Sequence, residues 1–135
     1  MKKIVSEDGT VLHLVHRLNE SKEQRTNLVE EDQFIQCSFL SMKKGTSFKP
    51  HQHIWKSPSY DNVIAQESWV VISGSVLVSF YDTNGVILEE LVLEAGDASF
   101  TLQGGHTYEI LEDNTLVYEY KTGPYEGQEK DKIFI

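Results

Sequence analysis

The sequence predicts an all-β protein, built as a barrel or a sandwich of many short strands. Short runs rich in Val, Ile, Leu, Phe and Tyr recur along the chain, and Gly, Asn and Asp residues separate them. Short strands at such a spacing are typical of β-sandwiches and barrels. With 135 residues, the chain is long enough for one compact domain with a core and too short for two.

The predicted strands follow one another between these turn signals. The clearest pair is a hairpin over 75–81 and 86–93, because Asn84-Gly85 accepts the positive φ that tight hairpins require. Residues 20–32 are polar and lack apolar residues at helical spacing, so we expect a loop there. Strands that are apolar on both faces, as in 69–72, favour a second covering layer or a subunit interface. In chain order, we expect strands at 10–18, 34–42, 48–54, 68–73, 75–81, 86–93, 98–102, 107–111 and 115–121.

Composition and charge exclude several function classes. The formal net charge is −9, and no basic stripe or arginine cluster is present, which argues against nucleic acid and anionic membrane surfaces as partners. No apolar run is long enough to span a bilayer, and no secretion signal follows the N-terminal lysines. The single cysteine, Cys37, allows no internal disulfide. We therefore expect a cytoplasmic protein.

Three histidines and one glutamate carry the chemistry that the sequence suggests. His51 and His53 are two residues apart, so on a strand their imidazoles share a face. Glu67 begins a later apolar strand, where a buried carboxylate needs a partner. His106 starts another strand after two glycines. This set matches the nitrogen and oxygen ligands of Fe, Mn, Ni, Cu or Zn, and it predicts one divalent transition metal.

The spacing of these residues resembles that of the cupin superfamily. The first cupin motif, G-x5-H-x-H and then E-x6-G, is matched over 45–53 and 67–74. The second motif, G-x5-P-x-G-x2-H, is matched in part, because Leu102 replaces the proline and His106 arrives one residue early. The resemblance implies a cupin-type β-barrel or jelly roll (a double-stranded β-helix). It implies a single cupin domain over 1–135, with the barrel over about 33–121, N-terminal strands within 1–32 as a short extension, and a tail at 122–135.

The two halves of the first motif are further apart than the family pattern has them. The 13 residues of 54–66 separate His53 from Glu67, and we expect them to form a long loop beside the site. Because such a loop can displace the glutamate, Gln66 and Asp61 are alternatives to Glu67 as the third ligand.

Two further segments, 104–113 and 121–134, sharpen the resemblance. They are similar to those of small single-domain bacterial cupins, some of which are encoded among genes for surface polysaccharide and sugar-nucleotide metabolism. This likeness implies a metal-dependent enzyme acting on a sugar or sugar nucleotide, with isomerase or epimerase chemistry in which the metal polarises an oxygen as a Lewis acid. The alternatives are a carbohydrate-binding or sensing protein without turnover, a metal-dependent dioxygenase, and a metal-free epimerase.

The candidate catalytic pair is His106 and Tyr108, which share a strand face. In a metal-free enzyme the base is His106 or His51, and the acid is Tyr108 or Tyr60. The alternative for Tyr108 is an aromatic residue of the core. The candidate residues of the substrate pocket are Trp55, Tyr60, Trp69 and Arg25. Core packing is the favoured alternative for Trp69, and a subunit contact is the alternative for Trp55 and Tyr60.

Two other histidines receive no metal role. His13 and His16 are three residues apart on a predicted strand, so they face opposite ways. As partners we expect a small, sugar-like ligand and a second copy of the chain. The homodimer is expected because small cupins commonly pair their sheets across a two-fold axis, and because the two-sided apolar strands need more cover than one barrel provides.

Overall fold

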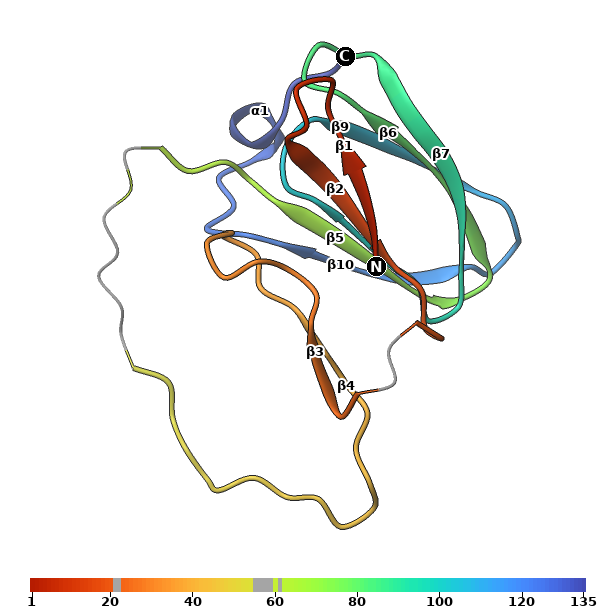
Figure 1. Cartoon of the computed structure of the whole chain (residues 1–135). Helices are drawn as coiled ribbons and strands as arrows, with labels where there is room; N and C mark the ends of the chain where they lie inside the picture. The colour runs from red at the N-terminus through yellow and green to blue at the C-terminus, as the bar shows by residue number, and fades with distance from the viewer. Residues whose placement is uncertain (21–22, 55–59, 61) are drawn as a thin grey trace.

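The computed structural model describes residues 1–20, 23–54, 60 and 62–135 (Figure 1). Over these residues the chain forms ten strands and one short helix, so the all-β prediction is confirmed. The elements are β1 (Lys2–Val5), β2 (Val11–His16), β3 (Arg25–Asn27), β4 (Ser38–Leu40), β5 (Glu67–Ser73), β6 (Ser75–Tyr81), β7 (Ile87–Glu94), β8 (Ala98–Thr101), β9 (Gly105–Ile110), β10 (Leu116–Lys121) and α1 (Gln128–Asp131).

Eight of these strands form two antiparallel sheets. The larger sheet has the order β1-β2-β8-β5-β10, and the smaller sheet has the order β7-β6-β9. The predicted hairpin between β6 and β7 is confirmed. Its Gly85 has a φ of 83°, and the Gly85 N–H donates to the carbonyl of Asp82 at 3.0 Å. The positive φ explains why a glycine occupies this position.

The two sheets pack face to face as a sandwich, with the apolar core between them. Within the described part of the chain the sheets do not close into a barrel, and β9 and β10 each lie at a sheet edge. Buried apolar side chains gain about 25 cal/mol for each Å² removed from water, which holds the two layers together. The buried core residues are Ile4, Val15 and Val71 from the larger sheet, and Val76, Val78, Phe80 and Leu93 from the smaller one.

The outer face of the larger sheet has a second cover, which comes from the chain itself. The hairpin of β3 and β4 and the segment between them lie against this face, and a second apolar cluster fills the space. This cover accounts for the strands that are apolar on both faces, among them β5 and β8. The buried members of this cluster are Leu14, Leu28, Val29, Ile35, Ala98, Phe100 and Leu102.

The predicted boundaries are wrong in three places. Residues 48–54 form no strand and are exposed. A strand needs a paired neighbour, and Pro50 lacks the N–H that a ladder uses. The predicted loop over 20–32 contains β3, because pairing with β4 outweighs its polar composition. The strand predicted over 34–42 shortens to Ser38–Leu40, since only these residues pair with β3.

Candidate functional site

A line of polar side chains crosses the inner face of the larger sheet. The strand register pairs Lys121 with Glu67, Glu67 with Thr101, and Thr101 with His13. Residues paired in this way project to the same side of a sheet. That side is the inner one, because Val71, which lies four positions after Glu67 on the same face of β5, belongs to the core between the sheets.

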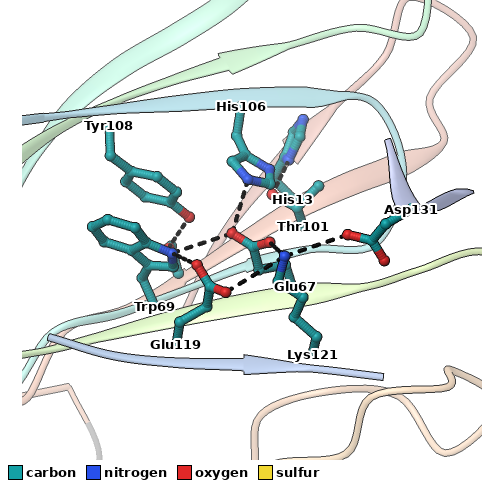
Figure 2. Close-up of polar contacts among 10 residues, drawn as sticks. His13, Glu67, Trp69, Thr101, His106, Tyr108, Glu119, Lys121 and Asp131 are labelled. Carbon is teal, nitrogen blue, oxygen red and sulfur yellow. Dashed lines mark hydrogen bonds and ion pairs between the residues drawn. The ribbon is translucent and has the colours of Figure 1, made fainter. Parts of the chain in front are cut away.

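The opposite sheet adds His106 to this line. His106 lies on β9, and its Nε2 is 3.1 Å from Glu67 Oε1 (Figure 2). The second carboxylate oxygen, Glu67 Oε2, is 3.1 Å from Lys121 Nζ. Burial by itself raises the pKa of Glu67, but the hydrogen bonds and charges of His106 and Lys121 outweigh it and lower that pKa to about 2. The carboxylate therefore stays ionised at neutral pH.

Lys121 lies among three carboxylates. Besides Glu67, its Nζ is 3.4 Å from Glu119 Oε1 and 3.3 Å from Asp131 Oδ2 on α1 (Figure 2). Burial lowers the pKa of Lys121, but these carboxylates raise it above its usual value, so the ammonium stays charged. Sequence reasoning missed Lys121, Glu119 and Asp131. The two-residue spacing of Glu119 and Lys121 was the available signal for a shared face, but only the fold brings Asp131 to them.

An aromatic stack forms one wall of the site. The rings of Trp69 and Tyr108 are parallel to within 5°, with centroids 3.9 Å apart. Trp69 Nε1 donates to Glu67 Oε1 and to Glu119 Oε2, each at 3.1 Å (Figure 2). Trp69 therefore contacts Glu67 while it packs against the core, and its role in a substrate pocket stays a prediction.

The hydroxyl of Tyr108 lies deeper in the protein than a proton donor at the surface of the site would. Its hydroxyl is 3.1 Å from Ser99 Oγ, and its ring centroid is 5.1 Å from that of His106. Burial raises the pKa of Tyr108, so the phenol stays neutral. The ring closes the side of the site next to His106, and its hydroxyl is directed toward the larger sheet.

His13 lies at the far end of the polar line and is fully buried. Its Nε2 donates to the Tyr81 carbonyl at 2.9 Å, and its Nδ1 is 3.1 Å from Thr101 Oγ1. Burial lowers the pKa of His13 to about 4, so this imidazole is neutral. His16 packs near Phe39 on the outer face, which confirms that the two histidines face opposite ways.

The structure does not bring His51 and His53 to Glu67 and His106. Both are exposed, with ring centroids 5.4 Å apart, and His51 Nδ1 donates to the Lys49 carbonyl at 2.9 Å. Their segment runs away from both sheets (Figure 1). Among the residues that the structure describes, no group of three or more His, Cys, Asp or Glu side chains is close enough to hold a metal.

Arg25 and Tyr60, two more of the predicted residues, also make their contacts away from Glu67 and His106. Arg25 is on β3, where it donates to Asn27 and Ser38 on the outer side of the larger sheet. Tyr60 is exposed and meets Phe34 edge-on, with ring centroids 5.0 Å apart. Trp55 and Asp61 lie outside the described residues.

Gln66, the alternative to Glu67, is buried and engaged elsewhere. Its Oε1 accepts from the Ile35 N–H at 2.8 Å, and its Nε2 donates to Gln33 Oε1 at 2.8 Å. These contacts tie the segment before β5 to the cover of the outer face. Glu67, and not Gln66, is therefore the residue at this end of β5 that meets His106.

Chemically, the site offers an ionised carboxylate next to an imidazole with one uncommitted nitrogen. A carboxylate only accepts, so Nε2 of His106 carries a proton, and Nδ1 has a free lone pair when the ring holds that proton alone. That Nδ1 is buried and has no hydrogen-bond partner among the residues that the structure describes. Such an arrangement suits a cation ligand or a proton acceptor.

Comparisons with known proteins found no match to this chain. No family model matches the chain, and no curated protein and no solved structure matches it. In the described part of the chain, no helix has the length and apolar character needed to cross a membrane.

Proposed function

We propose that this chain is a metal-binding cupin in which His106 and Glu67 form the inner half of the site, and His51 and His53 complete it. The observation that carries this proposal is the buried, unpartnered Nδ1 of His106, whose other nitrogen bonds Glu67. Histidines that bind metals commonly donate their second ring nitrogen to a carboxylate, which fixes the tautomer and orients the ring. Glu67 would hold His106 in that way, from the ring edge opposite to Nδ1.

Completion of the site requires the segment of His51 and His53 to approach β9. This strand is the last in the smaller sheet and offers one row of backbone N–H and C=O groups to a further strand. Residues 48–54 are exposed and unpaired, and they include Phe48 and Ile54, which are 66% and 80% exposed. Pairing on β9 buries such apolar side chains and moves two imidazoles toward His106. A jelly roll closed in this manner is the fold that the cupin motifs imply.

A bound divalent metal supplies a Lewis acid at this position. The protein's own residues supply the rest. Glu67 keeps the imidazole oriented, and the stack of Trp69 and Tyr108 excludes water from one side. The substrate class, a sugar or sugar nucleotide, rests on the resemblance of 104–113 and 121–134 to small bacterial cupins. The reaction proposed is isomerisation or epimerisation beside a carbonyl.

Metal analysis of untagged protein tests the proposal. We expect close to one transition metal per chain after reconstitution, and loss of that metal in both His106→Ala and His51→Ala. The matched control is Gln52→Ala, which changes an exposed side chain between the two motif histidines and should keep the metal. A wild-type protein that takes up no Fe, Mn, Ni, Cu or Zn contradicts the proposal.

The second candidate is metal-free acid–base catalysis by His106. The hydrogen bond from His106 to Glu67 favours it, because a base oriented by a carboxylate is a recurring catalytic arrangement. The two candidates separate in an assay with a nucleoside diphosphate hexose. Turnover that survives a chelator supports the metal-free enzyme, whereas binding of the hexose without product supports a carbohydrate-binding protein.

We also propose that the chain forms a homodimer through the part of the outer face that the β3–β4 cover leaves bare. Ile72, Tyr118 and Tyr120 are 48%, 60% and 56% exposed there, on neighbouring strands β5 and β10. Sedimentation equilibrium that returns a monomer of 15.4 kDa contradicts this dimer.

A further inference from the structure

The segment after β10 crosses the end of the sandwich that holds the candidate site. It leaves the larger sheet beside Lys121 on β10, and the side chain of Ile135 lies against Gly105 at the start of β9, in the smaller sheet. Gly105 allows this contact because it has no side chain: a Cβ atom there would lie 2.5 Å from Ile135 Cδ1. Residues 122–135 (the strap) therefore bridge the two sheets next to His106 (Figure 1).

An ion pair and a ring contact attach the middle of the strap to Lys121. Asp131 on α1 has a side chain that is 13% exposed, and its Oδ2 accepts from Lys121 Nζ at 3.3 Å (Figure 2). The ring centroid of Tyr125 lies 5.6 Å from the same nitrogen. Lys121 Nζ is also 3.1 Å from Glu67 Oε2, so the strap is attached to a residue that contacts the carboxylate of the site.

The rest of the strap adds little that keeps it in place. α1 contains no buried residue and has no side-chain hydrogen bond at its N-cap. The apolar side chains of Ile133 and Phe134 are 87% and 85% exposed, so they contribute almost no buried area. Segments with few buried apolar contacts open locally at a low cost in free energy, while the rest of the fold stays intact. The strap can therefore open without disturbing β9 or β10.

We propose that the strap is a lid that controls the access of solutes to His106. In the closed form seen here, the His106 side chain is 21% exposed and its Nδ1 is buried. Release of Asp131 from Lys121 frees α1 and withdraws Ile135 from Gly105, which opens the end of the sandwich next to the imidazole. That a ligand enters by this route rests on the function proposed above, whereas the movement of the strap does not.

Modification of the histidines by diethyl pyrocarbonate, followed residue by residue with mass spectrometry, measures this access. The reagent reacts with neutral imidazoles, so the reaction is run at about pH 7.5, on metal-free protein with chelator present. The exposed His51 is the internal reference for free access, and the buried His13 is the reference for opening of the whole fold. We expect His106 of the wild type to react about tenfold more slowly than His51.

Two substitutions loosen the strap to different extents. Asp131→Asn removes the ion pair with Lys121 and keeps the size of the side chain, so we expect His106 to react about fivefold faster than in the wild type. Ile135→Ala removes the contact at the start of β9, and we expect a smaller increase, of about twofold. The matched control is Glu129→Gln, which removes one negative charge from an exposed side chain of the same helix and should leave the rate unchanged.

Faster modification of His106 in Asp131→Asn, with unchanged rates at His51 and His13, supports the lid. Equal His106 rates in the wild type, Asp131→Asn and Glu129→Gln overturn it, as does a wild-type His106 that reacts as fast as His51. A parallel increase at His13 also overturns it, because the variant then opens the whole fold. Since neither metal nor substrate is present, these results do not depend on the proposed function, which the metal analysis and the hexose assay test separately.

Discussion

The two halves of the proposed metal set differ in how the fold holds them. Glu67 lies on β5 and His106 on β9, each strand is paired with a neighbour, and the two side chains are 3.1 Å apart. His51 and His53 lie on a segment that pairs with no strand in the described part of the chain, and both are exposed. Strand pairing therefore fixes Glu67 and His106 without a ligand. His51 and His53 would reach them only through the proposed pairing of residues 48–54 with β9.

This difference shows how much a short sequence motif such as H-x-H determines by itself. The H-x-H pattern puts two imidazoles on one face only if the residues form a strand, and a strand requires a neighbour. Residues 67–74 follow their motif because β8 and β10 pair on both sides of β5. Glu67 and His106 are therefore held by the folded core, whereas His51 and His53 lie on an exposed segment that forms no strand. Three measurements test this contrast.

The largest effect is expected at the aromatic wall. Trp69→Ala removes a stacked ring and two hydrogen bonds from the interior, and we expect the free energy of unfolding to fall by about 4 kcal/mol. The control on the loop side is Tyr60→Ala, which removes an exposed ring and should cost about 1 kcal/mol or less. Urea denaturation followed by circular dichroism measures both. Equal losses in the free energy of unfolding for the two variants would contradict the contrast between the two regions.

The second effect depends on pH and comes from His13. Its folded pKa is about 4, below the ordinary histidine value of 6.5 that applies to an unfolded chain, because burial disfavours the charged ring. Above pH 6.5 both states are neutral, and the stability contribution is complete. Between pH 6.5 and 4 only the unfolded state binds the proton, so the free energy of unfolding should fall by about 3 kcal/mol. His106 and Asp82 act on His13 with opposite signs and smaller effects than burial.

Urea midpoints measured at several pH values between 7 and 4 test this slope. His13→Gln, compared over the same range, should have a smaller slope, although it is less stable at neutral pH. The lowered pKa of Glu67 acts in a lower window, because its stabilisation is lost as the pH falls from 4.5 to about 2. A wild-type midpoint that stays constant from pH 6.5 to 4 would show that His13 is not buried as the structure places it.

The smallest effect is expected at the loop histidines. In a buffer with chelator, the double variant His51→Ala with His53→Ala should change the free energy of unfolding by less than about 0.5 kcal/mol, because both rings are exposed. Chemical denaturation measures it, with Gln52→Ala as the reference. A loss of about 2 kcal/mol or more without metal would mean that residues 48–54 are already paired in the metal-free protein, and it would end the contrast drawn above.

Much of the fold was predictable from local pattern. The strands from β5 to β10 follow their apolar runs, because each run has a length and period that pairing can use. The opposite faces of His13 and His16 followed from the two-residue period of a strand. The Asn84-Gly85 turn required no tertiary information, since the positive φ selects the residue.

The candidate site was predictable only in part. Glu67 and His106 were identified by motif spacing, and Trp69 by sharing a face with Glu67. Lys121, Glu119 and Asp131 were missed, because they come from other segments and only the register of β5 with β10 and the position of α1 bring them together. Arg25 was grouped with the pocket, but its strand pairs with β4 on the other side of the sheet.

The sequence by itself determined the class of the fold, the turns and the faces of the individual strands, because these depend on residues close together in the chain. The tertiary structure decided which strands are neighbours, and therefore which charges meet. It placed Lys121 beside Glu67, and in the described part of the chain it left residues 48–54 outside any strand. The physical reason is that strand pairing and burial are long-range: a side chain's partners depend on the register between segments, and local composition does not encode that register.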